Sequence, residues 1–280
     1  MRHSVQHIYK SSQQGDSLLY AWFTAMHTRV DIVIHGWGDE KELMDVIYRI
    51  EEALRQLEGA ANFYDPESEL AKINRIGALH PVKISSDLYK MIESCLAYNT
   101  QTFGCFDVTI HSEQYNRDSI HSVRLSADDQ TVFFKKQGTV INLSGFLKGY
   151  ALEKIRSILQ AHTIENALVN MGNSSVLALG SAPGGNGWKI GFGNQAESTD
   201  NAAEVCLHNE CLTTSGNDSN TRKHIISPHT NRLVEGKRQL AVVTEDGITG
   251  EVLSTSLFVA DSTLREAMIR AFAIKTIIEL

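Results

Sequence analysis

The prediction of the fold starts from the segment Asn142-Leu143-Ser144-Gly145-Phe146-Leu147-Lys148-Gly149-Tyr150. An apolar stretch ends here, a glycine-bearing turn follows, and Lys148 stands at the start of a predicted helix. Backbone N–H groups at a helix N-terminus attract anions, and an adjacent lysine strengthens such a site. The segment is therefore a candidate phosphate site, although a simple turn with a solvated lysine gives the same pattern.

Outward from this segment, helical and strand-like patterns are mixed without strict alternation. Helices are predicted over residues 41–57, 68–77, 86–102, 149–160 and 251–260, with further helix after residue 260. Strands are predicted over residues 28–36, 122–125, 131–135, 139–143, 167–170, 176–179, 188–192, 205–207, 212–214, 224–227 and 240–244. This mixture predicts an α+β fold, a single mixed domain over residues 21–280 with a largely antiparallel sheet and packed helices. Residues 1–20 are assigned to an N-terminal extension.

The composition restricts the function classes. The chain has 280 residues, 42% of them hydrophobic, and a net charge of −7 from 33 acidic and 26 basic residues. A general nucleic-acid surface is not expected at this charge. Since no run of about 18 apolar residues occurs, no membrane span is expected. The polar first 20 residues lack the apolar core of a signal peptide, which indicates a cytoplasmic protein, or an exported one if a signal has been removed.

Two segments combine small, amide and hydroxyl side chains at predicted strand ends. In Asn170-Met171-Gly172-Asn173-Ser174-Ser175, these side chains would let a ligand approach the backbone closely, although an ordinary turn would look the same. In Thr213-Thr214-Ser215-Gly216-Asn217, a hydroxyl-rich turn precedes His224-Ile225-Ile226-Ser227-Pro228 by a few residues. A histidine so close to such a turn is a candidate ligand contact, the alternative being a structural or solvated histidine.

A fourth segment, Thr249-Gly250-Glu251-Val252-Leu253-Ser254-Thr255, is a candidate cation site. Thr249 or Gly250 is a possible helix cap, and Glu251 and Thr255 are four residues apart on the predicted helix. Residues at this spacing share one helical face, so a carboxylate and a hydroxyl can reach one hard cation. The alternative is that Glu251 only complements the helix dipole in the first turn.

Seven segments, taken in order, resemble the motifs of the FAD:protein FMN transferase (ApbE) family. They are A-M-H-T at 25–28, F-Y-D-P-E-S-E-L at 63–70 with Asn74, F-D-V-T at 106–109, N-L-S-G-F-L-K-G-Y-A at 142–151, N-M-G-N at 170–173, T-S-G at 214–216 with H-I-I-S-P at 224–228, and E-V-L-S-T-S-L-F at 251–258. The resemblance runs from about residue 25 to residue 259, nearly the whole chain.

The resemblance implies an activity and a site. Proteins of the family transfer the FMN half of FAD, with Mg²⁺, to a threonine or serine hydroxyl of a target flavoprotein and release AMP. It implies FAD and Mg²⁺ as cofactors, and FAD and an acceptor flavoprotein as partners. It implies metal contacts at Gly145, Glu251 and Thr255, and a catalytic His224. The implied FAD contacts are Met26, Tyr64, Phe106, Asp107, Asn142, Lys148, Gly172, Asn173, Ser215 and Ile225.

The chain departs from the family at the implied site and not at its core pattern. Asn142, Asn173 and Ser227 replace family aspartates, and Glu251 replaces the metal-binding aspartate. Glu251 keeps the charge but adds a methylene, and Mg²⁺ tolerates little geometric error. Beside the transferase activity, the sequence therefore leaves open a non-catalytic FAD-binding protein and an FAD hydrolase that yields FMN and AMP.

The protein is expected to bind FAD more tightly than FMN, because the motifs represent both halves of the dinucleotide site. Calorimetric titration with FAD and with FMN measures this difference. Absence of FAD binding at high micromolar concentration would exclude all three flavin activities.

Overall fold

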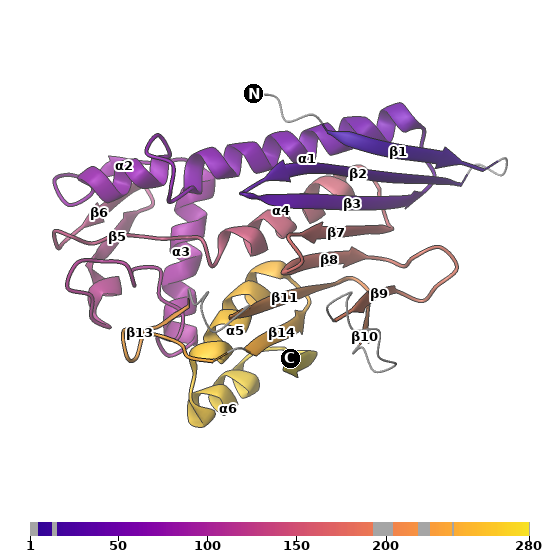
Figure 1. The fold of residues 1–280 in the computed structure, drawn as a ribbon. Helices are drawn as coiled ribbons and strands as arrows, with labels where there is room; N and C mark the ends of the chain where they lie inside the picture. Colours follow the sequence, from indigo (N-terminus) through magenta and orange to yellow (C-terminus); the bar gives the residue numbers. More distant parts are fainter. Residues whose placement is uncertain (1–4, 13–15, 193–203, 218–224, 237, 280) are drawn as a thin grey trace.

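An antiparallel sheet of eight strands forms the central layer of the structure (Figure 1), a computed structural model that describes residues 5–12, 16–192, 204–217, 225–236 and 238–279. The strand order is β1-β2-β3-β7-β8-β11-β14-β15, and all neighbouring pairs are antiparallel. The predicted α+β class with an antiparallel sheet is therefore confirmed. The strands are β1 (Gln6–Ser11), β2 (Ser17–Ala25), β3 (Thr28–Gly36), β7 (Ala167–Met171), β8 (Ser175–Leu179), β11 (Glu210–Asn217), β14 (Arg238–Thr244) and β15 (Thr276–Glu279).

Three helices pack against the sheet and each other (Figure 1). Helix α1 (Glu40–Ala61) lies against β2 and α4 (Leu147–Ala161), while α5 (Gly247–Val259) lies against β11, β14 and α4. The other helices are α2 (Glu69–Ile76), α3 (Ser86–Gln101), α6 (Ser262–Ala271) and the short 3-10 helix η1 (Ser119–Ser122). Side chains that accept a backbone N–H fix where five α-helices begin. They are Asp39, Ser68, Ser85, Asp246 and Asp261.

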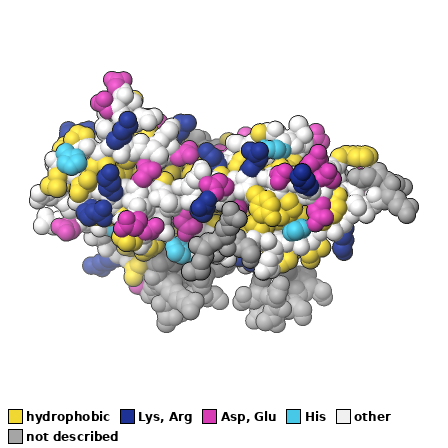
Figure 2. Space-filling view, turned by 90° about the horizontal axis from the view of Figure 1, so that it is seen from above, with side chains coloured by type: hydrophobic (Ala, Val, Ile, Leu, Met, Phe, Trp, Pro, Cys, Tyr) yellow, Lys and Arg dark blue, Asp and Glu magenta, His cyan; other side chains and the backbone are white. Residues whose placement is uncertain are grey.

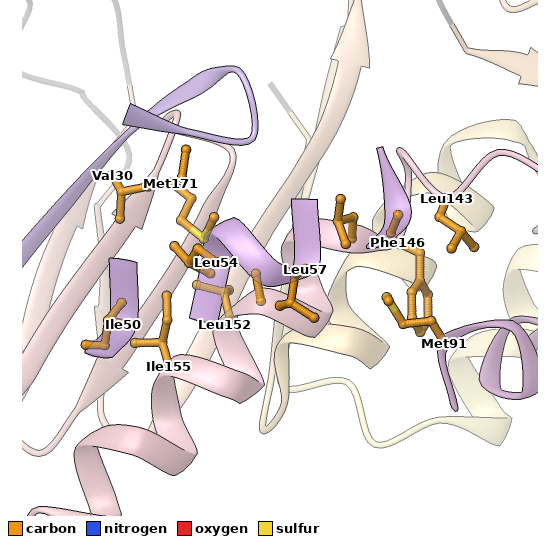
Figure 3. Close-up of a cluster of buried hydrophobic side chains, with 14 of the residues drawn as sticks. Val30, Ile50, Leu54, Leu57, Met91, Leu143, Phe146, Leu152, Ile155 and Met171 are labelled. Carbon is orange, nitrogen blue, oxygen red and sulfur yellow. The ribbon is translucent and has the colours of Figure 1, made fainter. Parts of the chain in front are cut away.

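The main core lies between the sheet and these helices (Figure 3). Val30 of β3 and Met171 of β7 face Leu54 of α1 and Leu152 of α4, and all four are buried. Strand residues alternate between the two faces, so the predicted apolar positions of residues 28–36 point to this core. The core therefore fixes α4 over the centre of the sheet, and with it the segment that begins at Asn142.

Smaller strands complete the molecule. The strands β4 (Val82–Lys83), β5 (Val123–Ser126) and β6 (Thr131–Phe134) form one sheet, and the pairs β9 (Trp188–Gly191) with β10 (Glu204–Leu207) and β12 (Ile226–Ser227) with β13 (Arg232–Leu233) form two more. Trp188 covers the second face of the large sheet, where its ring N–H donates to the Leu179 carbonyl at 2.7 Å.

One difference from the predicted elements lies in residues 139–143. They form no strand, because side chains satisfy their backbone groups in place of a neighbouring strand. The Asn74 amide donates to the Ile141 carbonyl at 2.9 Å, and its oxygen accepts the Ile141 N–H at 2.8 Å. The Ser112 hydroxyl accepts the Val140 N–H at 2.9 Å. Asn74 of α2 thus holds the chain just before the glycine turn.

Both ends of the chain also differ from the prediction. Strands β1 and β2 were not predicted, and the predicted domain boundary at residue 20 falls inside β2. At the other end, α6 agrees with the predicted helix after residue 260. The chain then forms β15, in which Ile277 and Ile278 pair with Val242 and Ala241 of β14. The pairing gives this short apolar segment hydrogen-bond partners at the edge of the sheet.

The surface carries mixed charge. Figure 2 shows Lys and Arg side chains interspersed with Asp and Glu over the face seen from above, with apolar side chains between them. None of the helices in the described ranges has the length and apolar character that crossing a bilayer requires.

Two glycines allow α4 and α5 to approach closely. A Cβ built on Gly149 would lie 2.4 Å from the Gly247 carbonyl oxygen, and one built on Gly247 would lie 3.0 Å from the Gly149 carbonyl oxygen. The Gly149 Cβ would also lie 2.9 Å from the Cβ of Glu251. Backbone atoms cannot move aside as a flexible side chain can, so only glycine fits at position 149.

Replacing Gly149 by alanine is expected to force α4 and α5 apart and to lower the free energy of unfolding by about 1–3 kcal/mol. Chemical denaturation followed by circular dichroism measures this value. Gly59→Ala is the matched control, because Gly59 lies near the end of α1 and a Cβ there meets no atom within 4 Å. The control is expected to stabilise the protein by up to about 1 kcal/mol. Equal stability of both variants would contradict the proposed close contact.

Candidate functional site

The first turn of α4 and the first turns of α5 meet at an ion pair. Helix α4 begins at Leu147, so Lys148 lies in its first turn as predicted. The Lys148 ammonium lies 3.6 Å from Oε1 of Glu251 and donates to the hydroxyl of Ser174. The Lys148 side chain is one quarter exposed and therefore reaches solvent from this contact.

Glu251 places a carboxyl group in the protein interior. It lies on α5 and is only 6% exposed. The hydroxyl of Ser175 on β8 donates to its Oε2 at 2.9 Å, while Oε1 faces Lys148. A buried carboxylate needs such partners, because desolvation without them is costly. The predicted caps Thr249 and Gly250 are wrong: the Asp246 side chain caps α5 by accepting the Thr249 N–H at 2.8 Å.

Thr255 follows Glu251 one turn later on α5 and is half-buried. Its hydroxyl lies 3.0 Å from the hydroxyl of Ser215 on β11, which also lies 2.9 Å from the hydroxyl of Ser254. The structure thus brings Ser215 and Thr255, predicted as a cofactor contact and a metal contact, into direct contact. Since β8 and β11 are paired, with Ser175 opposite Thr213, both serine contacts arise from neighbouring strands.

The glycine turn before α4 is held by its own side chains. The Asn142 side-chain oxygen accepts the Ser144 N–H at 2.9 Å, and the Asn142 N–H donates to the Val108 carbonyl at 2.8 Å. Gly145 is exposed, and a Cβ there would come within 3.9 Å of the Phe106 ring. The buried Phe106 ring lies 6.3 Å, centroid to centroid, from that of Phe146. Asn142 therefore shapes the turn, and Phe106 packs beneath it.

Asp107 is buried and its carboxylate is used within its own loop. Oδ1 accepts the Thr109 N–H at 2.7 Å and the Thr109 hydroxyl at 2.6 Å, while Oδ2 accepts the Tyr115 hydroxyl at 2.9 Å. Burial raises the pKa of Asp107 above its ordinary value, and these hydrogen bonds act in the opposite direction. The predicted FAD contact of Asp107 stays a prediction, and in the structure this carboxylate orders the loop after Phe106.

Met26 and Tyr64 lie near the C-terminal end of α1. Met26 and His27 form the turn between β2 and β3, both with positive φ, and the Met26 N–H donates to Glu58 at 3.1 Å. The Asn62 side chain links this turn to Tyr64, the next of the predicted FAD contacts. Its amide nitrogen lies 3.3 Å from the His27 ring, and its oxygen accepts the Tyr64 N–H at 3.0 Å. The Tyr64 ring is exposed and stands edge-on to Phe63.

Gly172 and Asn173 form the turn between β7 and β8, both with left-handed backbone. A Cβ on Gly172 would lie 2.1 Å from the Thr28 hydroxyl oxygen, so this position requires glycine. The Asn173 side chain accepts from the Asn170 amide at 2.9 Å. The turn leads directly into Ser174 and Ser175, and it therefore sets where these two hydroxyls reach Lys148 and Glu251.

The remaining predicted residues lie in the segment after β11. Ile225 is buried in the second apolar cluster, with Leu240, Val242 and Leu253 among its members. The predicted catalytic residue His224 lies outside the described residues.

Ser174, Ser175 and Ser254 were not predicted as site residues. A serine pair after a glycine turn was the available signal for the first two. Their partners lie elsewhere in the chain, Lys148 at 26 residues from Ser174 and Glu251 at 76 residues from Ser175.

The donor atoms at Glu251 and Thr255 fit a hard divalent cation. Magnesium binds through one or two carboxylates with other oxygen atoms, waters and substrate phosphates. Glu251 and Thr255 supply a carboxylate and a hydroxyl one turn apart, and Gly145 is implied to add its carbonyl. The described part of the chain holds no group of three or more His, Cys, Asp or Glu side chains that could bind a metal. A site with one carboxylate does not require such a group.

These features define an α+β protein with a glycine turn, a lysine and one buried carboxylate at the contact of two helices. The ApbE family model matches residues 26–278, and the chain belongs to the ApbE family.

Proteins of known name and structure are similar over most of the chain. A FAD:protein FMN transferase of Klebsiella pneumoniae (strain 342) is 22% identical over 274 residues, 87% of this chain and 83% of that protein. A FAD:protein FMN transferase of Vibrio cholerae is 23% identical over 254 residues, which are 80% of this chain and 75% of that protein. The structure of the flavin transferase ApbE from Vibrio cholerae has a TM-score of 0.78 at 19% identity. The match covers 98% of this chain and 93% of that chain. The ApbE protein of Thermotoga maritima has a TM-score of 0.74 at 23% identity, covering 89% of each chain.

Lys148→Ala is expected to weaken FAD binding by about 1–3 kcal/mol, the range for a charge-assisted hydrogen bond, if Lys148 contacts the diphosphate as the family resemblance implies. Calorimetric titration measures the change. Lys154→Ala is the control: Lys154 lies on the same helix and pairs with Asp87 at 3.3 Å, away from Glu251. FAD affinity of the control should equal that of the wild type. Unchanged affinity in a folded Lys148→Ala protein would show that this lysine does not contact the ligand.

Proposed function

We propose that this chain transfers the FMN moiety of FAD to a threonine or serine hydroxyl of an acceptor flavoprotein and releases AMP, with Mg²⁺ at Glu251 and Thr255. The observation that carries the proposal is the contact of Lys148 with the buried Glu251 beside the glycine turn. Membership of the ApbE family and the name FAD:protein FMN transferase of the relatives from Klebsiella and Vibrio support it.

The reaction is a phosphoryl transfer. The acceptor hydroxyl oxygen bonds to the phosphorus of the FMN half, the bond to the bridging oxygen breaks, and AMP leaves with that oxygen. The hydroxyl loses its proton during this exchange, and the proposed acceptor of that proton is His224, which passes it to solvent. Such reactions depend mainly on alignment and charge neutralisation, so the protein needs no covalent nucleophile. A bound Mg²⁺ would neutralise diphosphate charge and polarise the phosphoryl oxygens.

The side chains of this chain have separate tasks in the proposal. The Lys148 ammonium binds the diphosphate, and the exposed Gly145 turn lets phosphate approach the backbone. Glu251, Thr255 and the Gly145 carbonyl would hold the cation. The exposed Tyr64 ring offers an apolar face to the flavin. His224, implied by the resemblance to lie at the reacting centre, is proposed to assist the acceptor hydroxyl.

The decisive experiment incubates the pure protein with FAD and Mg²⁺, with and without a flavoprotein that carries a threonine or serine flavinylation site. Release of AMP together with covalent FMN on the acceptor supports transfer. Release of AMP and free FMN without dependence on the acceptor would show an FAD hydrolase, and FAD binding without cleavage would show a non-catalytic binding protein. Replacing the acceptor hydroxyl residue by alanine is the control.

Glu251→Gln is expected to abolish transfer, because the neutral amide is a poor ligand for Mg²⁺. Glu251→Asp is expected to keep or increase the activity, since it retains the charge and restores the residue of the family. AMP release measures both variants, with mass spectrometry of the acceptor. If the wild-type protein cleaves FAD equally fast with Mg²⁺ and with excess chelator, the metal assignment is wrong and Glu251 is an ordinary acid at a helix start.

A further inference from the structure

Each side-chain ligand proposed for the cation has a serine partner on the sheet. The Ser175 hydroxyl on β8 donates to Oε2 of Glu251 at 2.9 Å. The Ser215 hydroxyl on β11 lies 3.0 Å from that of Thr255. Of the two serines, only Ser175 contacts a charged group, and it was not among the residues that the family resemblance implied.

Ser175 is rigidly held. It is the first residue of β8, a central strand, where it pairs with Met171 of β7 and Thr213 of β11. It is fully buried, so its hydroxyl has no water with which to exchange hydrogen bonds. A donor fixed in this way restricts the carboxylate of Glu251 to one orientation.

The contact gives the two oxygens of Glu251 different roles. Oε2 is held by Ser175, while Oε1 points to the side of Lys148, 3.6 Å away. Oε1, which contacts the Lys148 ammonium in this structure, is therefore the Glu251 oxygen that Ser175 does not use. Because glutamate has one more rotatable bond than aspartate, its carboxylate needs an external hydrogen bond to keep this orientation.

We propose that Ser175 is a positioning residue that holds Oε1 of Glu251 toward the cation. The proposal rests on the proposed function, since it requires that Glu251 binds the cation. Hydrogen-bond partners behind a metal ligand orient it, and their loss typically weakens metal binding by about 10–100-fold. Ser175 contacts neither FAD nor the acceptor in this proposal and acts only through Glu251.

Mn²⁺ is the probe for the test, because electron paramagnetic resonance measures its free concentration directly. In the presence of FAD, Ser175→Ala is expected to bind Mn²⁺ about 10–100-fold more weakly than the wild type. Ser175→Thr retains a hydroxyl and should recover most of the affinity. FAD affinity in excess chelator should be the same in all three proteins. Mn²⁺ affinity of Ser175→Ala equal to that of the wild type would overturn the proposal.

Ser256→Ala is the matched control. Ser256 is also on α5 and fully buried, but its hydroxyl has no hydrogen-bond partner among the described residues. Its loss should leave Mn²⁺ binding unchanged. A similar loss of Mn²⁺ affinity in Ser256→Ala and Ser175→Ala would assign the effect to packing of α5 and overturn the proposal.

A double-mutant cycle separates positioning from a general effect on folding. If Ser175 acts through Glu251, then Ser175→Ala should weaken Mn²⁺ binding in the wild type and have no further effect in Glu251→Ala. Additive losses would overturn the proposal. Failure of the proposed function gives a different result, because the wild type with FAD would then bind no Mn²⁺ at the site. Thermal unfolding of each variant confirms that folded proteins are compared. If Ser175→Ala does not fold, Ser175→Cys supplies the test, because its thiol is only a weak hydrogen-bond donor and weaker Mn²⁺ binding is again expected.

Discussion

The close contact between α4 and α5 is the constraint on which the site depends. Without side chains at Gly149 and Gly247, the two backbones approach until a Cβ on Gly149 would meet a carbonyl oxygen. This approach places Lys148, one residue earlier, beside Glu251, one turn after Gly247. The sheet supports the arrangement from the other side, since α5 lies on β11 and β14 while α4 contacts β8.

The burial of Glu251 explains why hydroxyl groups gather around it. A carboxylate that loses water needs donors and positive charge, and here Ser175 and Lys148 supply them. All of these groups come from parts of the chain that are close only in the folded protein. The site is consequently sensitive to changes in how the helices pack, even where no site residue is altered.

Local patterns were sufficient to predict most of the fold. Strand β3 agrees with its predicted bounds, and α3 begins at residue 86 as predicted. Lys148 at a helix start and the shared face of Glu251 and Thr255 also follow from local spacing. The contact of Ser175 with Glu251 could not be predicted, because it joins residues 76 positions apart through tertiary packing. Strands β1 and β2 were not predicted because the polar residues near the start were interpreted as an extension.

The amide of Asn74 has a consequence for how the sequence before the glycine turn can vary. One side chain from α2 both donates to and accepts from Ile141, which is the exchange that a neighbouring strand residue would otherwise provide. The path of this segment is thus encoded at a distant position, and its own preference for extended structure matters little. Substitutions at Val140, Ile141 and Leu143 should be tolerated wherever apolar packing is kept, whereas loss of the amide at position 74 would detach the segment that leads to Lys148.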